Sequence, residues 1–420
     1  MDNIHERIKS MDNILINLPK EIAVLKDYAN SDIAPRKTEF SLYYNNIIYP
    51  IKEEYDIVAE CDYGMNLGHC WRLSDTVALP DKFSLKLKVY APFGKLIGER
   101  ETTIVLIEPN EKKKNLTLLC IGDSMTNSEN YVMQAVNKAR NITTVGTRST
   151  FTHVYHEGRG GWTIKKYFED YFSEFATSPF LFPKNVEGKK YYGQLSYMEK
   201  ISKATDQYSF RGFNCDDIKD GMYYLADDKK LYIYRNGKDE MCDENPEFEF
   251  DFDKYLERFN IKRPDVISIL FGGNELQISS YEVSEARVED MIFYLRKLIE
   301  CVAHKDTKIV VNLPVSCAEQ YAWGIKLGCT ATAKQYDYKV KMASKKLIEE
   351  FDCREDENIY LCPMGLVLDT KNGFDRSYYN VNAYCGRQEE HHNNWVHPGK
   401  AGYMQMGDAL AAMLNKIRSK

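Results

Sequence analysis

The chain has 420 residues, of which 44% are hydrophobic and 28% charged, and its formal net charge is −6. This length predicts two or three domains with ample cores, and the mild negative charge argues against nucleic acid as a partner. No apolar run reaches membrane-spanning length, and the eleven scattered cysteines contain no Cys-x-x-Cys motif, which argues against a disulfide framework and a zinc site.

The first residues lack the basic and apolar regions of a signal peptide. We therefore expect a reduced cytoplasmic protein, or one released by a route that needs no recognisable signal. Nothing in the sequence indicates a membrane partner, a cofactor or a metal.

Residues 1–36 are predicted to be a helical segment. Apolar residues recur there at alternating spacings of four and three, which is the pattern of a helical seam. Pro19 interrupts the pattern and would kink or split the helix. Two interpretations stay open: a coiled coil that makes a homo-oligomer, and a helix folded back on its own domain. The residues of the seam are Ile4, Ile8, Met11, Leu15, Leu18, Ile22 and Leu25.

Residues 37–110 are predicted to form a small antiparallel β-sandwich module. Residues 83–90 alternate apolar and polar side chains, residues 91–95 read as a turn, and residues 101–108 read as the return strand. Segments 38–44 and 55–60 add further strands. No catalytic set gathers in this module, so we expect it to serve packing or binding. A linker follows, to about residue 115.

From residue 115 to 420, buried strands alternate with helical patterns, which predicts a doubly wound parallel sheet with helices on both faces. The stretch from about 176 to 250 is rich in Tyr, Phe, Gly and Asp and fits this alternation poorly, so we expect an insertion over the carboxyl edge of the sheet. Strands are expected at 116–121, 142–145, 266–271, 308–313 and 358–362, and helices at 127–140, 283–303, 333–351 and 400–417.

The sequence Gly122-Asp123-Ser124 separates a buried strand from a helix. The Ser124 hydroxyl is therefore expected at the carboxyl edge of the sheet, where open α/β folds bind ligands. Backbone N–H groups of the first helical turn favour negative charge at the same place. Taken alone, however, Gly-Asp-Ser is also a common turn and helix cap.

Three further stretches could serve the same chemistry. A glycine-rich run at 157–163 can bring backbone N–H groups close to a ligand, Asn274 follows the strand at 266–271, and His397 precedes Pro398 at the start of the last helix. Each also has an ordinary reading, as a crossover loop, a helix cap and a structural histidine. His391 and His392 have no third ligand at a suitable spacing, so they do not predict a metal site.

Together, and in this order, the four stretches resemble the blocks of the SGNH (GDSL-type) hydrolase superfamily. The resemblance covers about 116 to 420 without the insertion, and it implies a flavodoxin-like three-layer α/β/α fold and hydrolysis of an ester. With the β-module in front, the glycine-rich run is also similar to that of bacterial carbohydrate esterases.

Carried onto this chain, the resemblance implies that Ser124 is the nucleophile and His397 its base. The backbone N–H groups of Ser124 and Gly161 and the side chain of Asn274 would form the oxyanion hole. Further residues beside these blocks are candidate substrate contacts, namely Asp123, Arg159, Trp162, Glu275 and Trp395.

One position departs from the family pattern. The family usually has Asp three residues before the histidine, and this chain has Asn394. Asn394 could orient His397 through its carbonyl oxygen, an acid such as Glu389 or Glu390 or a main-chain carbonyl could hold the ring, or the enzyme could be weak or inactive. We favour a working dyad or a substitute triad, because the nucleophile, base and oxyanion donors all remain.

The expected activity is therefore that of a serine esterase that removes short acyl groups, chiefly acetyl, from a carbohydrate. Two alternatives remain open: a catalytically weak or inactive oligomeric glycan-binding protein on an SGNH scaffold, and a lipase or thioesterase. Aromatic residues of the insertion could stack on sugar rings, although we expect most of them to cover apolar surface. They are Phe180, Phe182, Tyr191, Tyr192, Tyr197, Tyr208, Phe210 and Phe213.

Overall fold

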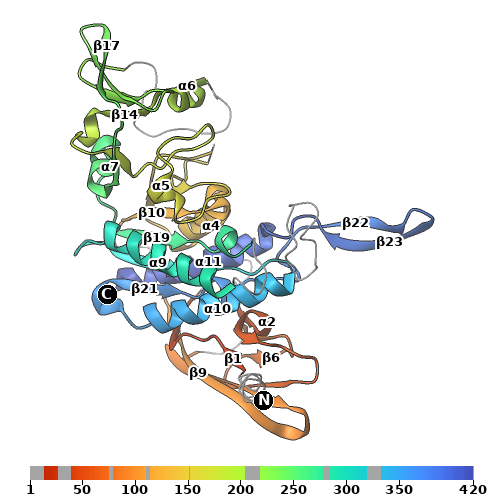
Figure 1. The fold of residues 1–420 in the computed structure, drawn as a ribbon. Coiled ribbons are helices and arrows are strands. Elements are labelled where there is room, and N and C mark those ends of the chain that lie inside the picture. The colour runs from red at the N-terminus through yellow and green to blue at the C-terminus, as the bar shows by residue number, and fades with distance from the viewer. Residues whose placement is uncertain are drawn as a thin grey trace, which may run out of the picture.

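A computed structural model describes residues 14–26, 39–74, 79–109, 114–150, 152–203, 218–277, 284–318 and 333–419. A central α/β body carries a β-rich module at one end and the insertion at the other, and a long hairpin projects from its side (Figure 1). No helix of the described ranges is long and apolar enough to cross a bilayer.

The central sheet has six strands that are paired in parallel, in the order β11-β10-β19-β20-β21, with β12 beside the end of β10. All residues of β19 are buried, as expected for a strand covered on both faces. The predicted doubly wound parallel sheet is confirmed. The strands are β10 (Leu116–Gly122), β11 (Ile142–Val145), β12 (Glu157–Gly158), β19 (Val266–Leu270), β20 (Lys308–Asn312) and β21 (Ile359–Cys362).

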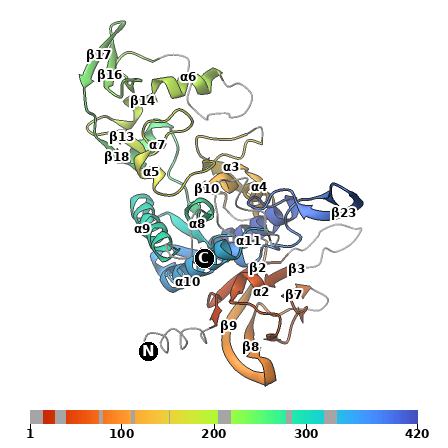
Figure 2. The ribbon, with the colours of Figure 1, turned by 45° about the vertical axis from the view of Figure 1, so that its right-hand side comes forward.

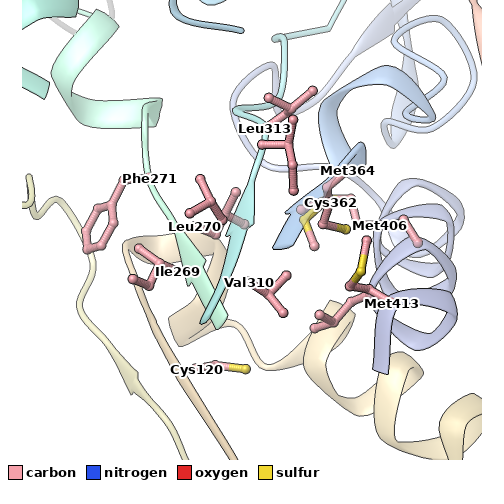
Figure 3. Packing of buried hydrophobic residues seen from close by; sticks show 14 of the residues in the cluster. Cys120, Ile269, Leu270, Phe271, Val310, Leu313, Cys362, Met364, Met406 and Met413 are labelled. Atoms are coloured by element: carbon pink, nitrogen blue, oxygen red, sulfur yellow. The ribbon is translucent and has the colours of Figure 1, made fainter. Parts of the chain in front are cut away.

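Helices cover the sheet and complete the three layers. Helix α11 packs on α4, and α9 packs on α10. Met406 and Met413 of α11 lie in the same buried cluster as Cys120 of β10 and Val310 of β20 (Figure 3). The helices of the body are α3 (Ser124–Asn127), α4 (Asn130–Ala139), α5 (Lys166–Glu169), α7 (Phe252–Arg258), α8 (Gly273–Gln277), α9 (Ser284–Val302), α10 (Ala333–Phe351), α11 (Lys400–Ser419), and the 3-10 turns η5 (Glu355–Glu357) and η6 (Met364–Leu366).

The N-terminal module contains two facing sheets, ordered β2-β9-β8-β5 and β3-β7-β6. Trp71 of one sheet contacts Phe83 of the other, with ring centroids 6.4 Å apart. All pairs in these two sheets are antiparallel except β2 with β9. The elements are β1 (Leu15–Ile16), β2 (Glu21–Leu25), β3 (Glu39–Tyr43), α2 (Tyr44–Ile47), β4 (Ile48–Tyr49), β5 (Asp56–Glu60), β6 (Met65–Asn66), β7 (Cys70–Ser74), β8 (Lys82–Ala91), η1 (Pro92–Gly94) and β9 (Lys95–Ile107).

The expected N-terminal helix is wrong for residues 14–26. These residues form β1 and β2, and β2 pairs with β9 in parallel. Ile22, Ala23 and Val24 are buried consecutively, a pattern that suits a strand buried on both faces and not one helical stripe. Residues 1–13 and 27–36 lie outside the described ranges, so oligomerisation through this segment stays a prediction.

The insertion forms small sheets of its own. One has the order β14-β15-β16-β17, and β13 pairs with β18. Its elements are β13 (Leu181–Pro183), η2 (Gly188–Lys190), β14 (Tyr191–Gln194), α6 (Leu195–Lys203), β15 (Tyr223–Leu225), β16 (Leu231–Arg235), β17 (Lys238–Asp243) and β18 (Phe248–Phe250). The aromatic residues 180, 182, 191, 192 and 197 are buried, as expected for side chains that cover apolar surface. Tyr208, Phe210 and Phe213 lie outside the described residues.

A two-stranded hairpin that the sequence did not predict precedes the last helix. It consists of β22 (Arg376–Asn382) and β23 (Cys385–His392) and extends away from the body (Figure 2). Most of its residues are exposed on both faces. The end of β23 leads directly into residues 394–397, which include the candidate general base His397.

Candidate active site

Ser124 and His397, which are 273 positions apart in the sequence, meet in a hydrogen bond. His397 Nε2 lies 2.7 Å from Ser124 Oγ. Ser124 begins α3 directly after β10, and His397 lies in the loop before α11. The central pair of the predicted site is therefore assembled.

The backbone at Gly122, two residues before Ser124, is closely packed against its neighbours. A Cβ added at Gly122 would collide with Thr126 Oγ1 and lie 2.7 Å from the Leu270 carbonyl oxygen. Asp123 caps α3, because its Oδ1 accepts a hydrogen bond from Met125 N at 2.9 Å. The turn thus presents the serine at the helix N-terminus.

The histidine loop is held at both sides by main-chain hydrogen bonds. Asn393 N donates to Asp375 O at 2.9 Å, and Gly399 N donates to Gly373 O at 2.8 Å. His397 is half-buried, and this burial lowers its pKa from the ordinary value of 6.5. The imidazole is therefore neutral at neutral pH, as a general base requires.

Asn394 faces the other ring nitrogen of His397. Its Oδ1 accepts hydrogen bonds from the backbone N–H of Val396 at 3.0 Å and of His397 at 2.9 Å. These two donors fix which end of the amide is oxygen, so Nδ2 is the atom that lies 3.3 Å from His397 Nδ1. Since an amide NH₂ only donates, Nδ1 is the acceptor, and the proton of the neutral ring resides on Nε2.

This geometry corrects two expectations about what orients the ring. The carbonyl oxygen of Asn394 binds backbone N–H groups and not the imidazole. Glu389 pairs with His391 at 2.8 Å and Glu390 pairs with Arg376 at 2.9 Å, both on the projecting hairpin. Neither acid substitutes for the missing aspartate.

The glycine-rich run reaches the other blocks through side chains of α8. Asn274 Nδ2 donates to the Trp162 carbonyl oxygen at 2.9 Å, next to the exposed Gly161. Glu275 accepts from Ile164 N at 2.7 Å and from Gly272 N at 3.0 Å. These contacts join the glycine and asparagine blocks.

The serine block contacts the asparagine block through the carboxylate of Asp123. A Cβ added at Gly273 would lie only 2.9 Å from Asp123 Oδ2, so this carboxylate packs against the start of α8. Burial raises the pKa of Asp123 to about 7. Burial, together with the charge of Asp123, also raises the pKa of Glu275 to about 7. All four predicted stretches therefore converge.

Four of the candidate substrate contacts are buried, which corrects that expectation. Asp123, Arg159, Trp162 and Glu275 are only 2%, 3%, 5% and 7% exposed. Arg159 pairs with Glu157 at 2.9 Å, which holds its guanidinium within the loop. Trp395 is half-buried, and its contact with substrate stays a prediction.

Sequence reasoning missed a buried polar network behind the glycine-rich run. Glu157 accepts hydrogen bonds from Thr147 N at 2.7 Å and from Tyr255 Oη at 2.7 Å, in addition to its pair with Arg159. His156 Nδ1 accepts from Gly158 N at 2.9 Å, and its Nε2 lies 3.2 Å from Glu129. Tyr255 of α7 lies 98 positions from Glu157, and Glu129 lies 27 positions from His156, so no local pattern could have revealed these two partners.

No group of three or more potential metal-ligating side chains gathers anywhere in the part of the chain that the structure describes. His391, considered above, pairs with Glu389.

Comparison with known families identifies the class of this protein. Residues 118–410 match the family described as GDSL-like Lipase/Acylhydrolase. This match spans more than half of the chain, so the chain belongs to that family, within the SGNH hydrolase superfamily. It is accordingly a hydrolase of ester bonds.

The solved structures that this chain matches share little sequence with it. A carbohydrate acetylesterase family member from Sinorhizobium meliloti is 12% identical, with 73% of this chain and 100% of that chain covered and a TM-score of 0.35. The lipase/acylhydrolase from Enterococcus faecalis is 9% identical, with 72% and 96% covered and a TM-score of 0.31. A peptidoglycan O-acetylesterase is 11% identical, with 74% and 93% covered and a TM-score of 0.28. No curated protein sequence matches this chain.

Proposed function

We propose that this protein is a serine esterase that removes short acyl groups, chiefly acetyl, from a carbohydrate, with Ser124 as nucleophile and His397 as general base. The observation that carries the proposal is the 2.7 Å hydrogen bond between Ser124 Oγ and His397 Nε2. A serine hydroxyl is a weak nucleophile unless an adjacent base takes its proton.

The reaction runs in two steps. Ser124 Oγ bonds to the ester carbonyl carbon while its proton passes to His397 Nε2, and the ester C–O bond breaks as His397 returns that proton to the leaving sugar hydroxyl. Water, deprotonated by the same nitrogen, then bonds to the acyl carbon; the bond to Ser124 Oγ breaks as His397 returns the proton to that oxygen, and the acid is released. The Ser124 and Gly161 N–H groups and the second N–H of Asn274 Nδ2 stabilise the oxyanion in each step.

The tautomer of His397 limits the rate of this cycle. Nε2 can accept the serine proton only when the ring proton resides on Nδ1, where it faces the Asn394 amide hydrogens. That arrangement costs free energy in every turnover, so slow hydrolysis is expected.

The test measures acetate release from acetylated sugars and the hydrolysis of nitrophenyl esters of increasing chain length. The proposal predicts turnover of nitrophenyl acetate and acetylated sugars by the wild type and its loss in Ser124→Ala. Cleavage of long-chain esters or thioesters, with acetyl esters untouched, would establish the lipase or thioesterase alternative instead.

A second candidate function is a glycan-binding protein on an inactive hydrolase scaffold. The observation that favours it is the Asn394 Nδ2 atom opposite His397 Nδ1, because this contact selects the unproductive tautomer. Binding of a glycan by the wild type and by Ser124→Ala, with no turnover by either, would decide for it.

A further inference from the structure

A cleft whose lining does not include Ser124 lies where the N-terminal module meets the α/β body. Asn45 of α2 lines it, and Figure 1 shows α2 at the boundary between the module and the body. Its volume is about 530 Å³, within the roughly 300–1,000 Å³ of small-molecule sites. The module contributes most of its wall, and the turn at residues 369–372 of the body contributes the rest. Interfaces between domains are a frequent place for such sites.

Hydrogen bonds across the interface hold the two walls together. Asn45 Nδ2 donates to Thr370 Oγ1 at 2.7 Å, and Asn46 Nδ2 donates to Leu368 O at 2.6 Å. Gln405 of α11 donates to Tyr43 Oη at 3.2 Å and accepts from Asp369 N at 2.9 Å. The cleft is thus formed before any ligand arrives, which reduces the ordering cost of binding.

The lining combines flat rings with neutral polar groups. Tyr43, Tyr55 and His69 supply the rings, and the Tyr43 and His69 ring centroids are 6.3 Å apart. Lys52 Nζ lies over one face of Tyr55, 5.3 Å from the ring centroid, so only the other face of this ring can stack on a sugar. Asn45 and Asn372 supply amides. Aromatic faces pack on the apolar C–H face of a sugar ring, and amides exchange hydrogen bonds with its hydroxyls.

The charges of the lining cancel. Lys52 and Lys371 oppose Glu53 and Asp369. The Asp369 carboxylate is occupied within its own turn, where it accepts hydrogen bonds from Lys371 N at 3.0 Å and from Asn372 N at 2.9 Å. Nothing in this balance favours a charged ligand, so the lining suits a neutral one.

We propose that this cleft is a second carbohydrate site, which binds a neutral sugar unit by stacking on Tyr55 and by hydrogen bonds to Asn45, His69 and Asn372. This inference rests on the proposed carbohydrate substrate. The same turn supports the histidine loop, because Lys371 O lies 3.0 Å from His392 Nε2 and Gly373 O accepts from Gly399 N. A polymeric substrate held in the cleft would therefore be retained beside the domain that carries Ser124.

The experiment uses the full-length Ser124→Ala protein and measures saturation-transfer NMR signals from neutral sugars. The probes are glucose, galactose, mannose, xylose and N-acetylglucosamine, and oligomers of the last two. We expect Tyr55→Ala to weaken binding of at least one probe about tenfold, equivalent to 1.4 kcal/mol. Tyr55→Phe keeps the ring and should bind normally, and Tyr378→Ala, on the exposed hairpin, is the matched control.

Two outcomes overturn the proposal: no probe gives a signal that Tyr55→Ala removes, or the cleft takes up only the apolar dye anilinonaphthalene sulfonate. Activity on nitrophenyl acetate is measured separately on the protein with Ser124 intact. Sugar binding without esterase activity contradicts the proposed function and leaves the cleft site standing. Esterase activity without Tyr55-dependent sugar binding contradicts the cleft site and leaves the esterase activity standing.

Discussion

Asn394 Nδ2 lies 3.3 Å from His397 Nδ1, with the amide orientation fixed by two backbone N–H groups that bind Oδ1. An aspartate at this position would keep both of those backbone bonds through one oxygen. Its other oxygen would accept a hydrogen bond from Nδ1–H, which keeps the ring proton on Nδ1 and so leaves the basic lone pair on Nε2, opposite Ser124. A single atom thus separates the unproductive tautomer of His397 from the productive one.

Asn394→Asp is therefore expected to increase kcat/KM for nitrophenyl acetate by about 10³–10⁴, the reverse of the loss seen when a triad aspartate becomes asparagine. Asn393→Asp is the matched control, because it adds the same charge at an exposed neighbouring position. An Asn394→Asp variant no faster than the wild type would show that the ring tautomer does not limit the rate.

The pH dependence of hydrolysis should report the surroundings of His397. Burial lowers the pKa of this imidazole from 6.5, so the wild-type rate should begin to fall only below about pH 6.5. In Asn394→Asp, the nearby carboxylate stabilises the imidazolium and should move this acid limb to higher pH. Profiles of kcat/KM against pH for the two proteins make the comparison. An identical midpoint in both would contradict a carboxylate contact with the ring.

Local patterns were sufficient for the central strands. The strands β10, β19, β20 and β21 are short runs of apolar residues, and each was predicted to within one or two residues because burial on both faces leaves a continuous signal. The N-terminal segment was misread because residues 15–25 satisfy a helical spacing by coincidence. The β22–β23 hairpin was missed because its exposed faces carry no apolar alternation.

The candidate site was predictable in part. Ser124 and His397 could be found because each follows or precedes a recognisable element, and the structure joins them. The orientation of the Asn394 amide could not be predicted, because it depends on which end of the amide the backbone N–H groups of Val396 and His397 face. Likewise, Glu275 is buried and accepts a hydrogen bond from Ile164 N, 111 positions away, so its role in holding the glycine-rich run was not visible in the sequence.

Asn274→Ala tests the oxyanion hole. Removing one such donor typically lowers kcat by about 10²–10³, with little change in KM, because the oxyanion exists only in the transition state. Asn274 Nδ2 also binds Trp162 O, so thermal unfolding of the variant must be measured beside its kinetics. A loss of less than about tenfold, in a protein of unchanged Tm, would show that Asn274 does not stabilise the oxyanion.

Gly158→Ala tests the contact between the glycine-rich run and α3. The added Cβ would lie 2.7 Å from the Thr126 carbonyl carbon and 2.9 Å from Asn127 Cα, both of which are backbone atoms that cannot move aside cheaply. We expect a loss of about 1–3 kcal/mol in stability and a displaced Ser124. Gly160→Ala is the control, since nothing lies within 4 Å of its added Cβ. Equal denaturant midpoints for the two variants would contradict this packing.

The buried carboxyl group of Asp123 should make stability fall as the pH rises. Its pKa is raised to about 7 in the folded protein, whereas an unfolded aspartate titrates near about 4. Between these values the folded state binds more protons than the unfolded state, so the free energy of unfolding decreases with increasing pH, by up to about 4 kcal/mol.

Asp123→Asn removes this titration and keeps an oxygen to cap Met125 N, so the stability of this variant relative to wild type should improve from pH 5 to pH 8. Denaturant unfolding at both pH values measures the difference, with Asp227→Asn at an exposed turn as the control. A constant difference across that range would mean that Asp123 is already ionised at pH 5.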